Sequence, residues 1–190
     1  MNTSRAVSPG EGGPAAGRLA LVLSPLGRVR LDTLAGLATD LRGRLRGDIS
    51  VGPMLALPDA RHPRRRQYLA SALLAQVRAH LPETGLALGV TDVDLYANRL
   101  AFVFGQAELG GRAGVISLAR LDPAWCGQPP SCALLRQRAL TEAMHELGHM
   151  LGAEHCRSPH CVMFFSHDLP DTDRKGADPC PRCRRYYPLR

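Results

Sequence analysis

The first half of the chain alternates between short apolar runs and longer stretches in which apolar residues recur at helical spacing. Apolar runs over 19–26, 49–54 and 86–91 predict buried strands. Two amphipathic helices are predicted between them, with apolar stripes formed by Leu31, Leu34, Leu37, Ala38, Leu41 and Leu45 in the first and by Ala70, Leu73, Leu74, Val77 and Leu81 in the second. This order is typical of parallel strands that are joined by helical crossovers.

The second half begins with two strand-like runs, over 100–105 and 113–120, that have no helix between them. Gly110 and Gly111 lie in the short connection, and this spacing favours an antiparallel pair. Together with the three earlier runs, the pattern predicts an α/β (α+β) fold with a mixed sheet of five strands.

The two ends of the chain differ from this regular pattern. A longer helix is predicted over 132–151, with Ser131 placed to cap its N-terminus. Beyond Gly152 no strong helix or strand pattern appears, and a segment of this size cannot bury a sufficient apolar core. We therefore expect another interaction to hold it in place. Residues 1–17 are rich in Gly, Pro, Ser and Ala, which predicts a disordered tail.

Three histidines and a glutamate in HELGHMLGAEH, residues 145–155, predict a catalytic zinc site. His145 and His149 are one helical turn apart, so both imidazoles can reach one ion. Gly152 can enter the left-handed backbone region without steric cost, which lets the chain turn and bring His155 round as the third ligand. A chance HExxH match in a solvated helix is the alternative, and the glycine and third histidine at these offsets argue against it.

The same motif supplies the groups that amide hydrolysis needs. Three imidazoles leave zinc one open position for water, whose pKa the ion lowers to about 7. Glu146 directly follows the first ligand and can accept the proton of this water and deliver it to a leaving amine. Apolar residues around Leu147 are expected to pack against the sheet, which leaves the histidine face of the helix for a cleft.

A second zinc site is predicted from four cysteines in two close pairs. Cys156 and Cys161 form the first pair, and Cys180 and Cys183 form CPRC near the C-terminus. Such pairs of thiolates are typical of a closed structural zinc site, whose binding free energy becomes folding free energy. Four unrelated reduced thiols are the alternative.

Composition and charge narrow the setting of these sites. The chain has 190 residues, 45% hydrophobic and 22% charged, as is typical of one globular domain. The formal net charge is +7, but the basic residues are spread along the chain, so charge selects no partner and we do not expect nucleic acid. No apolar run is long enough for a membrane span, and the N-terminus lacks the apolar core of a signal peptide. We expect a cytoplasmic monomer with reduced cysteines.

The histidine and cysteine motifs together resemble the archaemetzincin family of zinc metallopeptidases. The family pattern is HExxHxxGxxHC, a short spacer, CxM, a gap and CxxC, and this chain has HELGHMLGAEHC, RSPH, CVM, a gap and CPRC. The segments LGVTDVDLY, FVFGQA and VISLARL extend the resemblance over most of the chain from about Leu19 onward. The gap between Met163 and Cys180 is slightly shorter than in the family pattern, a difference that a loop can absorb.

This resemblance implies a metzincin-like fold with two lobes. An upper lobe over 18–155 holds the twisted sheet and the active-site helix, and a small irregular lower lobe over 156–190 binds the structural zinc. Met163 is implied to lie beneath the three histidines at the Met-turn, although an ordinary core methionine would differ little physically. Residues 100–104 are implied to form the antiparallel edge strand above the cleft, where an extended peptide can add by main-chain hydrogen bonds.

Several nearby residues are not expected to join either site. Phe165 stands where related metzincins carry a tyrosine that assists the oxyanion, so this group is expected to be absent. Cys126 and Cys132 flank a Pro-rich loop and are expected to be buried or free thiols. His160 and His167 lie in an irregular polar segment, where exposure to solvent is expected.

We therefore predict a zinc-dependent metallopeptidase with one catalytic and one structural zinc ion and a peptide or protein as substrate. The alternative is a zinc-stabilised binding module, for nucleic acid or protein, with little or no peptidase activity. Glu146 discriminates between them, because a three-histidine site with only a structural role does not need a carboxylate beside its first ligand.

Overall fold

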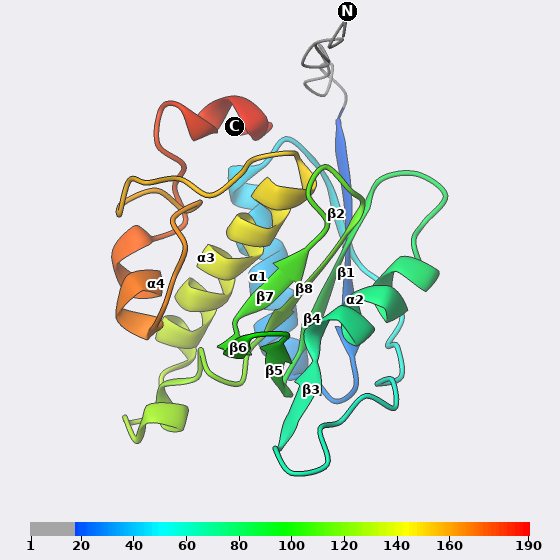
Figure 1. Cartoon of the computed structure of the whole chain (residues 1–190). Helices are drawn as coiled ribbons and strands as arrows, with labels where there is room; N and C mark the ends of the chain where they lie inside the picture. The colour runs from blue at the N-terminus through cyan, green and yellow to red at the C-terminus, as the bar shows by residue number, and fades with distance from the viewer. Residues whose placement is uncertain (1–17) are drawn as a thin grey trace, which may run out of the picture.

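Five strands form the main sheet of the computed structural model, which describes residues 18–190. In spatial order they are β2 (Gly47–Val51), β1 (Leu19–Leu26), β4 (Leu86–Thr91), β8 (Ala113–Ser117) and β7 (Gly105–Ala107) (Figure 1). Neighbouring strands from β2 to β8 are parallel, and β7 is antiparallel to β8. The predicted mixed sheet is confirmed, whereas the tail predicted over 1–17 lies outside the described residues.

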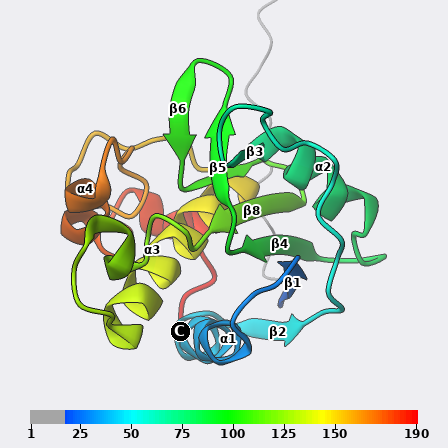
Figure 2. The same cartoon turned by 90° about the horizontal axis from the view of Figure 1, so that it is seen from below.

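Helices cover both faces of this sheet. α1 (Leu31–Arg44) and α3 (Cys132–Met150) pack on one face, and α2 (Ala70–Ala79) packs on the other (Figure 2). Successive side chains of a strand point to opposite faces, so in β4 Leu88 packs under α1 and α3 while Ala87 packs under α2. Within residues 18–190, no helix has the length and apolar character needed to cross a membrane.

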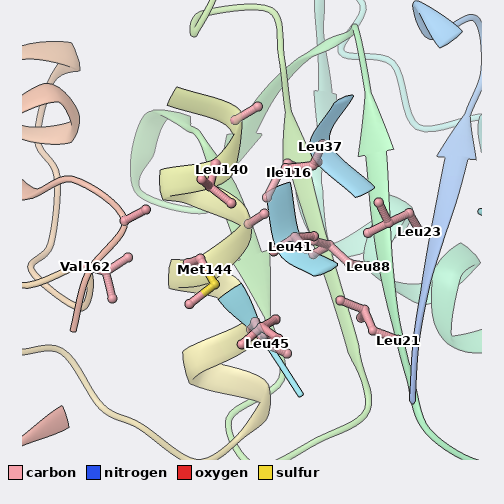
Figure 3. Close-up of a cluster of buried hydrophobic side chains, with 14 of the residues drawn as sticks. Leu21, Leu23, Leu37, Leu41, Leu45, Leu88, Ile116, Leu140, Met144 and Val162 are labelled. Atoms are coloured by element: carbon pink, nitrogen blue, oxygen red, sulfur yellow. The ribbon is translucent and has the colours of Figure 1, made fainter. Parts of the chain in front are cut away.

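The larger apolar cluster joins the sheet to α1 and α3. Figure 3 shows Leu88 and Ile116 from the sheet beside Leu41 of α1 and Met144 of α3, all with 0% exposure. Val162, from the segment beyond α3, belongs to the same cluster. The C-terminal segment therefore has an apolar contact with the main core, which its irregular sequence pattern did not predict.

A separate small sheet is formed by β3 (Gln67–Leu69), β5 (Asp94–Ala97) and β6 (Leu100–Val103). The single strand predicted over 100–105 is therefore wrong, because 100–103 pair with β5 while Gly105 begins β7 beside β8. Arg99, with φ of 71°, turns the chain back between β5 and β6. An apolar run shows that a segment is a strand but not which partner it pairs with.

The helix that begins after Ser131 is confirmed, with the Ser131 hydroxyl accepting a hydrogen bond from a backbone N–H of the first turn. Beyond it the structure adds α4 (Leu169–Lys175), which was not predicted. Asp168 caps α4 and Pro170 lies in its first turn, and both are usual signals of a helix start. Two short 3-10 helices complete the chain, η1 (Pro123–Cys126) and η2 (Cys183–Tyr186).

The C-terminal residues pack against the end of α1. Leu189 forms an isolated β-bridge with Leu45, and the Arg190 side chain donates a hydrogen bond to the Leu45 carbonyl oxygen at 3.1 Å. Arg44 forms an ion pair with Asp178. These contacts connect the segment that follows α3 to the N-terminal half of the molecule.

Replacing Leu88 by Ala should lower the free energy of unfolding by about 2 to 5 kcal/mol, because it removes a fully buried side chain and leaves a cavity between the sheet and α3. Leu31, which is 73% exposed, provides the matched control, and Leu31→Ala should change stability by less than about 0.5 kcal/mol. Urea unfolding followed by circular dichroism measures both. Equal effects of the two substitutions would contradict the assignment of the core.

Candidate active site

Three histidines converge at the C-terminal end of α3. His145 and His149 lie on its last turns, and Gly152, with φ of 89°, lets the chain leave the helix and bring His155 beside them. The Nε2 atom of His149 is 3.2 Å from the Nε2 atoms of both His145 and His155. Nitrogen ligands at zinc distance and tetrahedral angles lie about 3.3 Å apart, so the spacing of these three atoms fits a zinc ion.

Backbone carbonyl groups orient two of these imidazoles. His145 Nδ1 lies 2.7 Å from the carbonyl oxygen of Val162, and His149 Nδ1 lies 2.8 Å from that of Ala153. A carbonyl oxygen can only accept, so each Nδ1 carries the proton and each Nε2 presents a lone pair to the centre. The donor set is therefore arranged for a metal ion.

Burial keeps the histidines in the neutral form that binds metal. Desolvation lowers the pKa of His145 well below its ordinary value, and the charge of Lys175 lowers it further. Desolvation also lowers the pKa of His149 to about 4, with a smaller contribution from His155. The pKa of His155 is lowered by desolvation too, although this side chain is the most exposed of the three. Neutral imidazoles at pH 7 are ready ligands.

Glu146 lies at the junction of α3 and the edge strand β7. Its side chain is only 4% exposed, and among residues 18–190 its Oε2 atom has no hydrogen-bond partner. A Cβ atom on Gly105 would lie 2.4 Å from Glu146 Oε1, so only glycine leaves room for the carboxylate at this point of β7. Desolvation, followed by the charge of Glu142, raises the pKa of Glu146 well above its ordinary value. A carboxyl group with a raised pKa and a free oxygen is suited to proton transfer.

The base of the site is apolar except for one tyrosine. Met163 is fully buried under α3. The hydroxyl of Tyr187 donates to the carbonyl oxygen of Met144 at 3.0 Å and lies 2.8 Å from the sulfur of Met163. Tyr187 thus packs behind the histidines rather than in the cleft. Phe165 is at the cleft, with its ring 5.1 Å from the ring of His155.

Four cysteines form a second cluster, directly after the third histidine. The sulfur atoms of Cys156, Cys161, Cys180 and Cys183 all lie within 4.8 Å of one another, and the distance between Cys156 Sγ and Cys180 Sγ is 3.8 Å. Four thiolates around one zinc ion lie about 3.8 Å apart, so this donor set fits a structural ion. Cys126 and Cys132 are exposed and lie outside this cluster. Of the two expectations for them, burial is therefore wrong, whereas free thiols are consistent with the structure.

Two adjoining cavities open beside the histidines. One of about 670 Å³ includes all three histidines and is bordered by β7 and by Leu109 and Phe165. The other, of about 150 Å³, extends from His145 and Glu146 along β6 to the end of α4. β7, not the predicted 100–104, is the antiparallel edge of the main sheet, although β6 also lines both cavities. The cleft therefore follows the boundary between the two sheets.

The smaller cavity contains charged residues that the motifs did not reveal. Lys175 Nζ lies 3.1 Å from Glu142 Oε1, and both side chains are almost fully buried, at 0% and 3% exposure. The hydroxyl of Thr172 donates to the same Glu142 oxygen at 3.0 Å. His167, which is exposed as expected, lies at the mouth of this cavity, and His160 is exposed elsewhere. One feature of the composition could have indicated this cavity, because Lys175 is the only lysine in the whole sequence.

Comparisons with known proteins agree with this geometry. The family model of peptidase family M54 matches residues 64–187. An archaemetzincin from Pyrococcus abyssi is 42% identical over 177 residues, which cover 87% of this chain and 92% of the relative. The crystal structure of archaemetzincin from Methanopyrus kandleri matches with a TM-score of 0.77 at 35% identity, covering 90% of this chain and 94% of that one. Archaemetzincin from Archaeoglobus fulgidus, solved in complex with malonate, matches with a TM-score of 0.71 at 35% identity, covering 88% and 99%.

Replacing Gly105 by Ala should displace the Glu146 carboxylate, because the added methyl group would lie 2.4 Å from Glu146 Oε1 and 2.7 Å from the backbone oxygen of Val115. We expect kcat for peptide cleavage to fall by about 100-fold, the usual effect of a misplaced catalytic group, while the histidine site keeps its metal. Gly43→Ala makes the same chemical change in open space on α1 and should leave kcat unchanged. Kinetics together with metal analysis measure both variants, and an unaltered kcat in Gly105→Ala would contradict the role of this close approach.

Proposed function

Because this chain belongs to peptidase family M54, and is thus a zinc metallopeptidase, we propose that His145, His149 and His155 hold its catalytic zinc and that Glu146 is the general base. The convergence of the three Nε2 atoms, with Glu146 beside them, is the observation that supports this proposal. A zinc ion bound there supplies a Lewis acid and a water ligand that ionises near pH 7.

Proton transfer and substrate positioning are then carried out by residues of the chain. The free Oε2 of Glu146 accepts the proton of the attacking water, and the same carboxyl group returns it to the leaving amine. The unpaired edge of β7 offers backbone groups to an extended peptide, which positions the scissile bond between the edge and the histidines. Burial of Glu146 excludes bulk water from the proton-transfer step.

A second zinc ion on the four cysteines is the other part of the proposal. Closed coordination by Cys156, Cys161, Cys180 and Cys183 would join the two ends of the C-terminal segment and add its binding free energy to the stability of the fold. This supports a division into an upper lobe over 18–155 and a lower lobe over 156–190. Free thiols placed as metal ligands, rather than joined in disulfides, also support a reducing, cytoplasmic setting. A monomer is proposed because the ligands of both clusters come from one chain.

An anionic ligand suits this centre on electrostatic grounds. The Archaeoglobus archaemetzincin was crystallised with malonate, a dicarboxylate. In this chain a zinc ion on the three histidines would lie near the ammonium group of Lys175, so carboxylate groups of substrates or inhibitors should be attracted to the site.

Metal analysis of point variants should separate the two zinc sites. His149→Ala should lower the zinc content from about two ions per chain to about one, because two imidazoles alone hold zinc weakly. Cys183→Ala should remove the other ion and also lower the thermal unfolding midpoint, because that ion stabilises the lower lobe. His160→Ala, an exposed histidine outside both clusters, should keep both ions. Full zinc content in His149→Ala would overturn the ligand assignment.

Glu146→Gln should bind both zinc ions but lose peptide cleavage by at least about 1000-fold, because an amide cannot accept the water proton. Glu154→Gln changes an exposed carboxylate of the same cleft and should retain activity. A mixed peptide library, digested with and without a chelator and analysed by mass spectrometry, measures cleavage. Continued hydrolysis by Glu146→Gln would refute its role, and an inactive wild type that binds RNA or DNA tightly in a salt-dependent manner would favour the binding-module alternative.

A further inference from the structure

Lys175 is an exceptional residue in this chain. Of the 24 basic residues, it alone is a lysine, and its side chain is completely buried at the end of α4. A long planar guanidinium has five fixed donors, whereas a compact ammonium directs three protons at separate acceptors. The position therefore requires a small point charge in a chain that otherwise uses arginine.

The ammonium group has one proton left after its two protein contacts. Lys175 Nζ donates to Glu142 Oε1 at 3.1 Å and, through a longer contact of 3.4 Å, to the backbone oxygen of Phe164. Lys175 lines the cavity of about 150 Å³, so its third proton is the one available to an acceptor that enters there. The pair with Glu142 holds the ammonium in place, because two oppositely charged groups that are both buried cannot reorient independently.

A second donor lines the same cavity. The hydroxyl of Ser166 is buried and, among residues 18–190, has no hydrogen-bond partner. A buried hydroxyl without a partner is costly, so its free proton indicates a place for an acceptor. Lys175 and Ser166 are thus two buried donors in the wall of one small cavity, whose other lining is mostly apolar and includes Phe102, Val103 and Phe104.

The place of this cavity in the reaction follows from Glu146. The carboxyl group that returns a proton to the leaving amine must lie on the side of the scissile bond that carries that amine. Glu146 lines both cavities, but the small one extends from it toward Glu142, whereas His149 and His155 line only the larger one. The small cavity thus lies on the side of Glu146 away from these two histidines, which is the place for the side chain of the residue that follows the scissile bond.

We propose that this cavity, with Lys175 and Ser166 as donors, selects an acidic residue, Asp or Glu, immediately after the scissile bond. The proposal rests on the peptidase function proposed above. A carboxylate has two oxygens that accept hydrogen bonds, and a hydrogen bond between charged partners is about twice as strong as a neutral one. The acidic groups that face the cavity are Glu142, whose Oε1 is already bonded to Lys175 and Thr172, and Glu146. A zinc ion held by His145 and the other two histidines would add positive charge beside this cavity.

Matched peptides that differ only at the residue after the scissile bond test the selection. We expect kcat/KM to be about tenfold higher for Glu than for the isosteric Gln, and lowest for Lys. Equal rates for Glu and Gln, or a preference for Lys or for an apolar residue, would overturn the proposal while leaving the peptidase function intact.

Variants of the cavity should change this ratio in a defined way. Removing Lys175 alone would leave Glu142 buried without its partner and destabilise the fold, so Lys175→Met is combined with Glu142→Gln. In this double variant the ratio of kcat/KM for Glu to that for Gln should fall from about ten to about one, whatever the absolute rate. Ser166→Ala should lower the ratio by a smaller factor, about threefold. An unchanged ratio in the folded double variant would assign Lys175 to stability alone.

The single lysine also allows a direct measurement of binding without turnover. In zinc-loaded Glu146→Gln protein labelled with ¹³C-lysine, Lys175 supplies the only lysine side-chain signal. The Glu peptide should shift this signal and bind about tenfold more tightly than the Gln peptide. Equal affinities and no shift would reject the proposal. This measurement decides the question even if the wild type cleaves no peptide, the result that would reject the peptidase function instead.

Discussion

Burial of the active-site helix on two sides is the constraint on which the rest of the structure depends. One face of α3 packs its apolar residues on the sheet. The other face carries a polar stripe at helical spacing, and polar groups are costly to bury without partners. Each of its four polar residues has a partner in the chain beyond α3, and the pairs are Arg138 with Asp173, Glu142 with Lys175, His145 with Val162 and His149 with Ala153. The lower part of the molecule is therefore arranged to satisfy the polar stripe of α3.

The same contacts prepare the chemistry. Hydrogen bonds from Nδ1 to backbone oxygens fix two imidazoles so that their Nε2 atoms face one point. Glu146, in contrast, has no partner for its Oε2 among residues 18–190, and Gly105 on the sheet edge leaves room for its Oε1. The polar stripe of α3 thus supplies histidine ligands in fixed orientations, while Glu146 beside it has a carboxylate oxygen that is able to exchange a proton.

The two metal-binding clusters depend on each other through the chain. Cys156 directly follows His155, so any movement of the cysteine cluster would move the third histidine. Apolar contacts of Val162 and Met163 with the core, and of the C-terminal residues with α1, hold this region from both ends. Metal binding and packing therefore act together on a segment that has few regular elements.

The sequence by itself determined the family, the histidine and cysteine motifs, and the helices and central strands, because these depend on spacing within short segments. Asp168 and Pro170 are local sequence signals for the start of α4, although that helix was not predicted. Only the tertiary structure decided that Gly105, rather than the run 100–104, begins the edge strand, and that Tyr187 lies behind Met163. It also placed Lys175 against Glu142. These pairings join residues far apart in the chain, and local periodicity contains no information about which distant partner a residue will meet.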